Sequence, residues 1–593
     1  MGRDRTILPM PLTSAVTTRK DLLAAFVAAA LAFALPQLVP SAPQPLTGTA
    51  GDLTAMIGFG ALIAFIGART ARCGRVLLAE PGLMALLVVL AALVAAALCS
   101  AIFLGGPPRL IARQAGTVGI AAVALLAGAR LMQRDASGAL HHLHIVRALL
   151  LALMLAGAVN AVIAAMQYLA PGSTWVPMGA DGRAFGHMLQ PNHLATQLLW
   201  SLLALVALRE IGRLPGWLFT ALAFVMIVAL AMTASRTGAV ASLLPALWGL
   251  CDRRLSRSSR AALVAVPLLL ILCWWVLAAN AATVGHAFAG TGLLQKADPT
   301  SSRLGVWQQS LRLIAQNPWF GVGWGQFGLA WTLTPMEPIA RIGSYSFTHP
   351  HNLLLMWGVE FGLPLTLALV AAIGWAGWRA LRRARGADGA EGVVRSAALV
   401  MVAVVMLHSQ LEYPLWYASF LLPTACFCGL ALGTGAGPAP RVWEKLPPTL
   451  AGGAIALLGL LVLYDYQTVA NVYAPPLQDG LTTEQRMARA SRSVLFGQFG
   501  DRFTGTLARP GQRQLAPYRE IVFEQVDLRL LVSWSLAHAE QGQVDKARYL
   551  AARLKEFDHP IARQFVAVCA TPQAAQAFQC TAPPPGIGFR DFR

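Results

Sequence analysis

A succession of long apolar runs constrains this chain more than any other sequence feature. A helix needs about 20 apolar residues to cross about 30 Å of hydrocarbon, and most of the runs approach that length. Their number and spacing predict about 13 membrane-spanning helices. The first run ends near Leu38, and the others lie near residues 51–67, 82–104, 115–132, 147–169, 193–208, 215–233, 237–251, 261–281, 352–378, 394–411, 415–435 and 448–467.

Composition supports the same fold class. Of the 593 residues, 56% are apolar and 12% are charged, and the mean hydropathy is +0.57, values outside the range of soluble globular proteins. The first run follows a basic segment and lacks a clear small-residue cleavage site, so we expect it to be a membrane helix rather than a removed signal peptide. We predict an all-α polytopic membrane protein with a small soluble helical C-terminal domain.

The arrangement of positive charge predicts an orientation. A net charge of +19 could suit nucleic acid, but no basic stripe with interleaved aromatic residues occurs, so we expect no nucleic-acid partner. Basic residues instead gather in alternate connections, as near Arg69, at 253–260 and at 379–385. This asymmetry predicts a cytoplasmic N-terminus, and an odd number of spans then places the tail outside.

This topology divides the chain into six predicted parts. Residues 1–169 form N-terminal membrane helices, 170–192 an external loop, 193–280 membrane helices, 281–351 a large external loop, 352–467 membrane helices and 468–593 an external tail.

The tail has its own helical pattern. Residues 527–557 predict two amphipathic helices broken at Glu540-Gln-Gly-Gln543, a helical hairpin that is too short to establish a repeat array. Cys569 and Cys580 lie in this polar tail and could form a disulfide if the tail faces an oxidising compartment.

The segment Ser346-Phe-Thr-His-Pro-His-Asn352 carries the main catalytic candidate, His349. An imidazole titrates near neutral pH, so at the water-facing end of a helix it can accept a proton from a hydroxyl. His351 would point elsewhere, two residues on. Two alternatives remain open: both histidines merely cap the helix beginning at Leu353, or they bind a metal, for which no nearby acidic or Cys cluster supplies further ligands.

Arg183, Arg236 and Arg303 lie on the side of the membrane where positive charge is usually depleted. A guanidinium group binds phosphate oxygens bidentately, so the three together would suit a diphosphate. Each alone could equally be an interfacial side chain that reaches toward water.

Further polar residues mark the ends of predicted membrane helices. Hydrogen-bonding groups at these positions suit a sugar, although helix capping explains Asn192 equally well, and Glu360 is costly in lipid unless it faces the protein interior with a partner. These residues are Gln190, Asn192 and His193 at a helix entry, His408, Glu412 and Tyr413 at a helix exit, and Glu360 in the helix after Asn352.

Several of these segments, in this order, resemble a known family. Over roughly residues 220–375 they resemble the O-antigen ligase and polymerase superfamily, and more specifically the chain resembles its bacterial protein O-oligosaccharyltransferases of the pilin-glycosylation type. The first resemblance rests on Arg303-Leu-Gly-Val-Trp307, Asn317-Pro-Trp-Phe-Gly-Val-Gly-Trp-Gly325, His349-Pro-His-Asn352 and Glu360-Phe-Gly-Leu-Pro364; the second rests on Gly182-Arg183, Gly186-His-Met-Leu-Gln-Pro-Asn-His-Leu-Ala195, Glu412-Tyr-Pro-Leu-Trp416 and the polar tail. His187 departs from the pattern, in which Asn is expected.

The resemblance implies an enzyme of the bacterial inner membrane with its active site facing the periplasm. It would transfer a preassembled oligosaccharide from undecaprenyl diphosphate to Ser or Thr hydroxyls of a periplasmic protein such as a pilin, without metal or other cofactor. By motif position Gln190, His349 and Tyr413 would be functional, with the three arginines on the diphosphate. The supporting residues would be Asn192, His193, His351, Asn352, Glu360, His408 and Glu412.

The residue chemistry and the family resemblance together predict a mechanism. The arginines would improve the diphosphate as a leaving group, and His349 would take the proton of the attacking hydroxyl. The reaction would invert the anomeric centre of the sugar. One alternative changes the acceptor, giving an O-antigen ligase to lipid A core or an O-antigen polymerase. A more remote alternative is a transporter, whose usual signs are discontinuous helices and paired intramembrane charges.

Overall fold

Helices account for most of the chain that the computed structural model describes. The described residues are 18–40, 45–69, 80–134, 140–179, 181–188, 190–212, 214–281, 287–291, 300–336, 346–434, 442–476, 479–524, 526–571 and 576–593. Within these ranges the only β-type pairing is a single bridge between Arg134 and Leu140.

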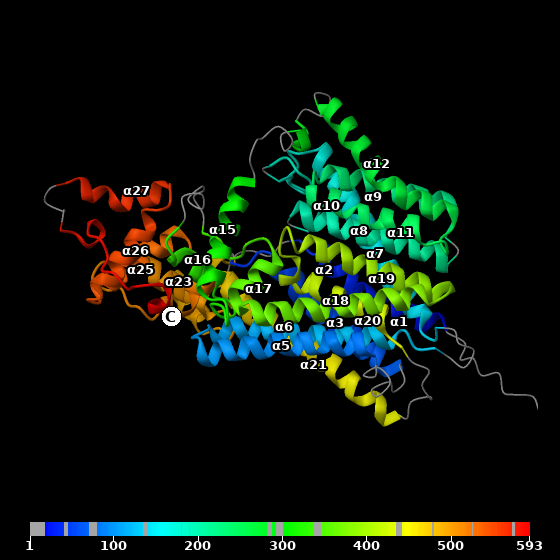
Figure 1. Ribbon diagram of the computed structural model, residues 1–593, viewed down its shortest axis with the longest axis horizontal. Helices are drawn as coiled ribbons and strands as arrows, with labels where there is room; N and C mark the ends of the chain where they lie inside the picture. The colour runs from blue at the N-terminus through cyan, green and yellow to red at the C-terminus, as the bar shows by residue number, and fades with distance from the viewer. Residues whose placement is uncertain are drawn as a thin grey trace, which may run out of the picture.

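Ten helical segments in the described ranges are long and apolar enough to cross a membrane, which confirms the predicted all-α polytopic class. They lie side by side along the long axis of the molecule (Figure 1). The segments are α1–α2 (Arg19–Ala29 and Leu35–Leu38, joined by a π-helical turn), α3 (Thr49–Arg69), α5 (Pro81–Phe103), α6 (Pro108–Arg130), α7 (Leu143–Leu169), α8 (Pro191–Ile211), α12 (Arg257–Ala279), α18 (Leu363–Arg385), α19 (Gly389–His408) and α21 (Val442–Tyr473).

The three remaining predicted runs are helical but shorter, namely α9 (Gly216–Met232), α20 (Ala418–Leu432) and the pair α10 (Arg236–Ala241) and α11 (Leu243–Cys251). The break between α10 and α11 follows from Pro245, which has no N–H to donate to the carbonyl four residues earlier.

The predicted run 352–378 is also interrupted, at Gly362. Here α17 (Leu353–Phe361) ends and α18 begins. Gly362 has φ +77°, and a Cβ at this position would lie 2.6 Å from the backbone carbonyl of Trp319. Glycine therefore lets the connection between α15 (Thr300–Gln316) and α16 (Phe327–Leu333) pass directly over the break.

Small residues bring the helices of the bundle into close contact. A Cβ added to Gly60 of α3 would lie 2.4 Å from the backbone of Ala456 in α21, and one added to Gly452 would lie 2.2 Å from Ala64. A Cβ on Gly429 of α20 would lie 2.2 Å from the Leu125 carbonyl of α6. Membrane helices gain packing energy this way, because lipid supplies little hydrophobic drive for association.

Helix α8 lies at the centre of the bundle and is buried over most of its length. The indole of Trp200 donates to the carbonyl of Met401 in α19 (2.8 Å), and the hydroxyl of Ser201 donates to that of Leu153 in α7 (2.8 Å). These two bonds tie α8 to α19 and α7 and so help to hold in place the residues that precede it.

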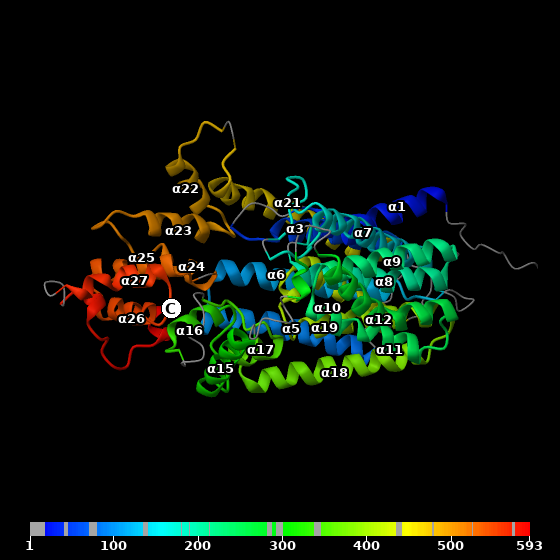
Figure 2. The same cartoon turned by 90° about the horizontal axis from the view of Figure 1, so that it is seen from above.

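The two ends of the bundle differ in chemistry. One end carries ion pairs of buried or half-buried arginines, including Arg379 and Arg383 with Glu80, Arg254 with Asp252 and Arg395 with Glu391. The other end carries the tail, seen in orange and red in Figures 1 and 2.

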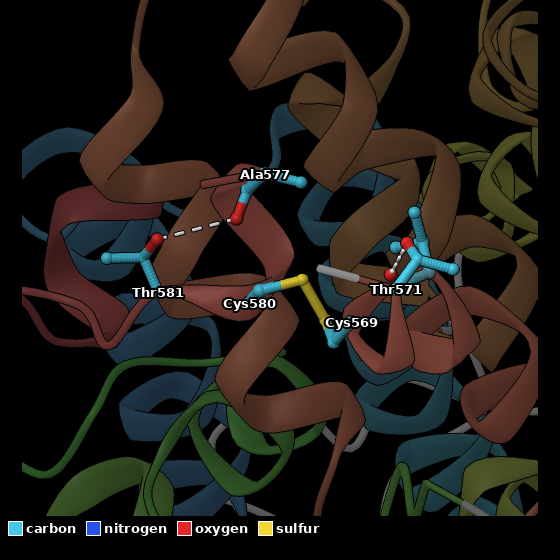
Figure 3. Close-up of a disulfide and its surroundings, with 6 residues drawn as sticks. Cys569, Thr571, Ala577, Cys580 and Thr581 are labelled. Carbon is cyan, nitrogen blue, oxygen red and sulfur yellow. Dashed lines mark hydrogen bonds between the residues drawn. A yellow bond between two sulfur atoms is a disulfide. The ribbon is translucent and has the colours of Figure 1, made fainter. Parts of the chain in front are cut away.

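The tail contains α22 (Thr483–Ser491), α23 (Gly497–Leu507), α24 (Tyr518–Glu524), α25 (Leu528–Glu540), α26 (Val544–Leu554) and α27 (Pro560–Val566). Helices α25 and α26 form the predicted hairpin, which is confirmed, with Gly542 at φ +76° in the turn. Cys569 and Cys580 are joined in a disulfide beside it (Figure 3).

Residues of the tail form hydrogen bonds with the segments that precede the histidine motif in sequence. Tyr549 donates its hydroxyl to the Leu333 carbonyl at the end of α16 (Phe327–Leu333), at 2.5 Å. The Met336 N–H donates to Glu556 (2.9 Å), and Ser346 donates to the Val526 carbonyl. On the membrane side, Arg113 of α6 pairs with Glu524. These contacts make the tail one wall of the region that holds the candidate site.

Candidate active site

Four connections at the tail end of the bundle bring the predicted polar residues together. They are the loop from α7 to α8, the turn from α9 to α10, the segments around α15 (Thr300–Gln316) and residues 346–352, and the turn from α19 to α20. Their side chains are linked by hydrogen bonds across as many as 220 residues of sequence, so the cluster is a product of the fold rather than of one motif.

Glu412 is the centre of this cluster. Its Oε1 accepts from Arg303 Nη2 (3.0 Å) and Asn192 Nδ2 (3.1 Å), and its Oε2 lies 2.7 Å from Nδ1 of His351. The side chain is 5% exposed. Burial opposes ionisation, but the hydrogen bond and charge of His351, together with Arg303, outweigh it and lower the pKa of Glu412 to about 2. Glu412 is therefore a buried carboxylate at neutral pH.

Asn192 extends the cluster toward a second arginine. Its Oδ1 accepts from the Ser235 hydroxyl (2.7 Å) and from Arg183 Nη2 (3.3 Å), while Arg183 Nε donates to the Thr233 carbonyl (2.9 Å). Burial lowers the pKa of Arg183, although the nearby Asp181 carboxylate opposes this. The Asn192 amide thus connects Arg183 to Glu412.

The three arginines differ in their freedom to meet a ligand. Arg303 is 34% exposed and Arg183 is 17% exposed, both partly engaged by the cluster. Arg236, at the start of α10, is exposed, and its charge acts on Arg183. All three therefore contribute positive potential to one region at the tail end of the bundle.

The two histidines of the 346–352 segment lie in different surroundings. His351 has φ +54°, an uncommon conformation for a residue with a side chain, and this turns its ring toward Glu412. Because an ionised carboxylate only accepts, Nδ1 of His351 is the donor in this bond. His351 is half-buried, and Nε2 is the ring nitrogen that Glu412 does not engage.

His349 is more deeply enclosed. Its ring packs on that of Tyr413 with centroids 3.3 Å apart and lies 4.6 Å from that of His351, and its Nδ1 is buried without a hydrogen-bond partner among the described residues. Burial, with a smaller effect of His351, lowers the pKa of His349 to about 3. His349 is therefore neutral and a weak base in this structure.

His193 and His408 lie one layer deeper, toward the bundle interior. Nδ1 of His408 is 2.8 Å from the Thr196 hydroxyl, and the His193 ring packs against the rings of Tyr417 and Phe420 with centroids 5.0 Å away. Gln190 precedes α8 and lines a cavity next to Tyr413. These residues support or border the Glu412 cluster and are not bonded to its carboxylate in the structure.

Two predicted residues serve local structure. The Asn352 side chain accepts from the Leu355 N–H (3.0 Å) and so caps α17, and it donates to the Gln410 carbonyl (3.1 Å). Glu360 is buried, and its carboxyl group accepts from the N–H of Phe327 (3.3 Å) at the start of α16. This backbone group is the partner that the sequence required but did not identify.

Sequence reasoning missed two contributors. Ser235 caps α10 and also binds Asn192, a dual role that its position in Ala234-Ser-Arg-Thr-Gly238 only partly signals. Asp52, in the first turn of α3, accepts from both the N–H and the hydroxyl of Ser419 (3.1 and 3.2 Å) at the start of α20. An acidic residue at the beginning of an apolar run was its only signal.

No group of three His, Cys, Asp or Glu side chains in the described part of the chain is arranged to hold a metal ion.

Comparison with protein families identifies two regions. Residues 221–370 match the family described as O-antigen ligase. Residues 396–565 match the C-terminal region of the family described as virulence factor membrane-bound polymerase. The first region contains Arg236, Arg303 and both histidines of the 346–352 segment, and the second contains Glu412 and the hairpin of the tail.

Two curated proteins of Acinetobacter baylyi are similar to parts of the chain. The general O-oligosaccharyltransferase is 26% identical over 292 residues, which cover 47% of this chain and 48% of the relative. The ComP-specific O-oligosaccharyltransferase is 27% identical over 259 residues, 42% and 44% of the two chains. The chain thus spans about half the length of the curated relatives it matches. Residues 221–370 of this multi-pass membrane protein are therefore similar to the O-antigen ligase family.

Proposed function

We propose that this chain transfers a preassembled oligosaccharide from undecaprenyl diphosphate to Ser or Thr hydroxyls of a periplasmic protein. The observation that carries the proposal is the shared carboxylate of Glu412, which holds the imidazole of His351 and the guanidinium of Arg303 side by side. A base for a hydroxyl and a cation for a diphosphate are the two groups that such a transfer requires.

In the proposed reaction the acceptor hydroxyl oxygen attacks the anomeric carbon of the donor sugar. The bond between that carbon and the diphosphate oxygen breaks, and the hydroxyl proton passes to Nε2 of His351. Attack from the side opposite the diphosphate inverts the anomeric centre. Glu412 keeps Nδ1–H of His351 in place and stabilises the imidazolium that forms, as a carboxylate does in a catalytic triad.

The geometry favours His351 as the proton acceptor over His349, the residue expected from the sequence. His351 has an ionised carboxylate partner and partial exposure, whereas His349 is enclosed against Tyr413 with a pKa lowered to about 3. We assign His349 to positioning, since its ring supports both Tyr413 and His351.

The arginines would bind the departing diphosphate. Arg236 is exposed and can turn toward a ligand, and Arg303 and Arg183 each retain donors beyond those used by the cluster. Neutralising the developing charge on the diphosphate lowers the barrier for its departure.

The inner membrane with a periplasmic site is the location that fits these parts. Positive charge is depleted from the site end relative to the arginine-rich end. The Cys569–Cys580 disulfide lies in the tail at the site end, and such bonds persist in oxidising compartments such as the periplasm.

The protein acceptor is supported by the names of the two A. baylyi relatives, and the rival acceptor, lipid A core, by the ligase family itself. One experiment separates them. The chain is expressed in a ligase-deficient Gram-negative host that carries an undecaprenyl-linked glycan and a candidate pilin. We expect glycan on the pilin and unmodified lipopolysaccharide, with His351→Ala as the inactive control. Glycan only on lipopolysaccharide would overturn the protein acceptor.

A further inference from the structure

A cavity of about 310 Å³ lies beside the candidate active site. The end of α2, the turn before α3, the loop preceding α8 and the residues around the start of α20 form its walls. Its lining includes Val39, Thr47, His187, Gln190, Tyr413 and Tyr417. The volume falls at the lower end of the range typical of small-molecule sites.

The lining has the chemistry of a sugar site. Tyr413 and Tyr417 contribute phenol rings to the lining, and the His187 imidazole and the Gln190 amide contribute hydrogen-bonding groups. No Lys, Arg, Asp or Glu occurs among the lining residues of this cavity. A pyranose has apolar C–H faces that pack on aromatic rings and hydroxyls at its edge that need hydrogen-bond partners. An acyl chain would leave the polar groups unpaired, and a free ion would meet no opposite charge.

The cavity is adjacent to the groups that would perform the transfer. The ring of Tyr413 lines the cavity and also packs against His349, whose ring lies 4.6 Å from that of His351. Gln190 lies two residues before Asn192, which bonds both Arg183 and Glu412. A ligand in the cavity is thus close to both the arginines and the proposed base.

We propose that this cavity binds the first sugar of the donor, the one whose anomeric carbon is attached to the diphosphate. The inference rests on the proposed transferase function and adds a subsite to it. Its outer wall comes from Val39 and Thr47, which lie outside the regions matched by the two families. The N-terminal helices therefore take part in selecting the donor sugar.

Gly48 shapes this wall. It has φ +89°, and a Cβ there would lie 2.8 Å from the ring of Tyr417. Glycine lets the turn before α3 approach the ring closely and fixes the width of the cavity at this point.

The experiment tests this subsite by filling the cavity with a larger side chain. Purified full-length protein in liposomes is supplied with an acceptor pilin and undecaprenyl diphosphate bearing a single N-acetylhexosamine, and KM for the donor and kcat are measured. Val39→Trp places an indole in the cavity, and Leu35→Trp places one on the exposed side of α2 as the matched control. We expect KM for the donor to rise at least tenfold for Val39→Trp and to stay within twofold for Leu35→Trp.

Thr47→Trp provides a second variant if Val39→Trp does not fold, because Thr47 lies at an exposed turn and also lines the cavity. An unchanged KM in a folded cavity-filling variant, with active wild type, would overturn the sugar subsite and leave the transferase proposal intact. Absence of transfer by wild type with every donor tested would overturn both.

Discussion

Glu412 has the most consequential position at the scale of single residues. It is 5% exposed and accepts from two side chains while pairing with His351. Removing one partner of a buried, bonded charge is costlier than the net gain from the pair. A change at Glu412 should therefore affect both the proposed base and the arginines.

The two histidines can be distinguished by matched substitutions to Phe. His349→Phe keeps a ring against Tyr413, so we expect kcat to fall less than tenfold. His351→Phe removes the proposed proton acceptor, and we expect kcat to fall at least about 100-fold. Transfer rates of purified, folded variants test this, and the reverse ranking would return the base to His349.

The pH dependence of the unfolding free energy should show how much the Glu412 cluster stabilises the fold. The folded-state pKa, about 2, lies below the ordinary value of a glutamate. The stabilisation of the folded state by the ionised Glu412 is therefore present above about pH 4.3 and is lost as pH falls toward 2. Between pH 5 and pH 3 we expect wild type to lose roughly 2 kcal/mol more unfolding free energy than Glu412→Gln. Denaturant unfolding in detergent at both pH values measures the difference, and equal losses would contradict the cluster.

Sequence reasoning named residues that the structure brings together around Glu412, but not their pairings. Arg303, Glu412, Asn192 and both histidines could be named because charged and amide groups at membrane helix ends are uncommon. That Arg303 and Asn192 meet on one carboxylate could not be predicted, since they lie 109 and 220 residues from Glu412 in sequence. The positive φ of His351, which turns its ring toward Glu412, follows from the packed loop and has no local sequence signal.

At the scale of elements, the tail and the membrane bundle both contact the segment 346–352, which carries the two histidines. Helices α24 to α26 contact α6, α16 and residue 346 through Glu524, Tyr549 and the Val526 carbonyl. The loop that carries the histidines is thus held from the tail side as well as by α17. Loss of tail docking should reduce both the unfolding free energy of the protein and the rate of sugar transfer.

The Arg113–Glu524 ion pair tests this docking. Both side chains are largely buried, at 15% and 8% exposure, so Arg113→Met leaves a carboxylate without its cation and should cost about 3 kcal/mol. The double variant Arg113→Met, Glu524→Met replaces the pair with apolar side chains and should recover most of that loss. Release of the tail by limited proteolysis and denaturant unfolding provide the measurements. A double variant no more stable than Arg113→Met would show that the pair is not coupled.

At the scale of the whole molecule, hydropathy predicted the bundle but not its interruptions. The runs were recognisable because a membrane demands long apolar helices. The separation of α17 from α18 depends on Gly362 meeting the Trp319 backbone, a contact between distant segments. The split of α10 from α11 was signalled by Pro245, but a proline alone does not say whether a membrane helix kinks or ends.

The final prediction concerns which end of the bundle faces the periplasm. Gly386, after α18, is exposed at the arginine-rich end, and Gly480, before α22, is exposed in the tail. Each is replaced by Cys in a background where the six cysteines outside the disulfide are Ala. Because basic connections remain in the cytoplasm, we expect a membrane-impermeant maleimide to label Gly480→Cys in cells with a permeabilised outer membrane. Gly386→Cys should be labelled only after the inner membrane is also opened. Labelling of Gly386→Cys alone in the first condition would place the Glu412 cluster in the cytoplasm, where a periplasmic acceptor could not reach it.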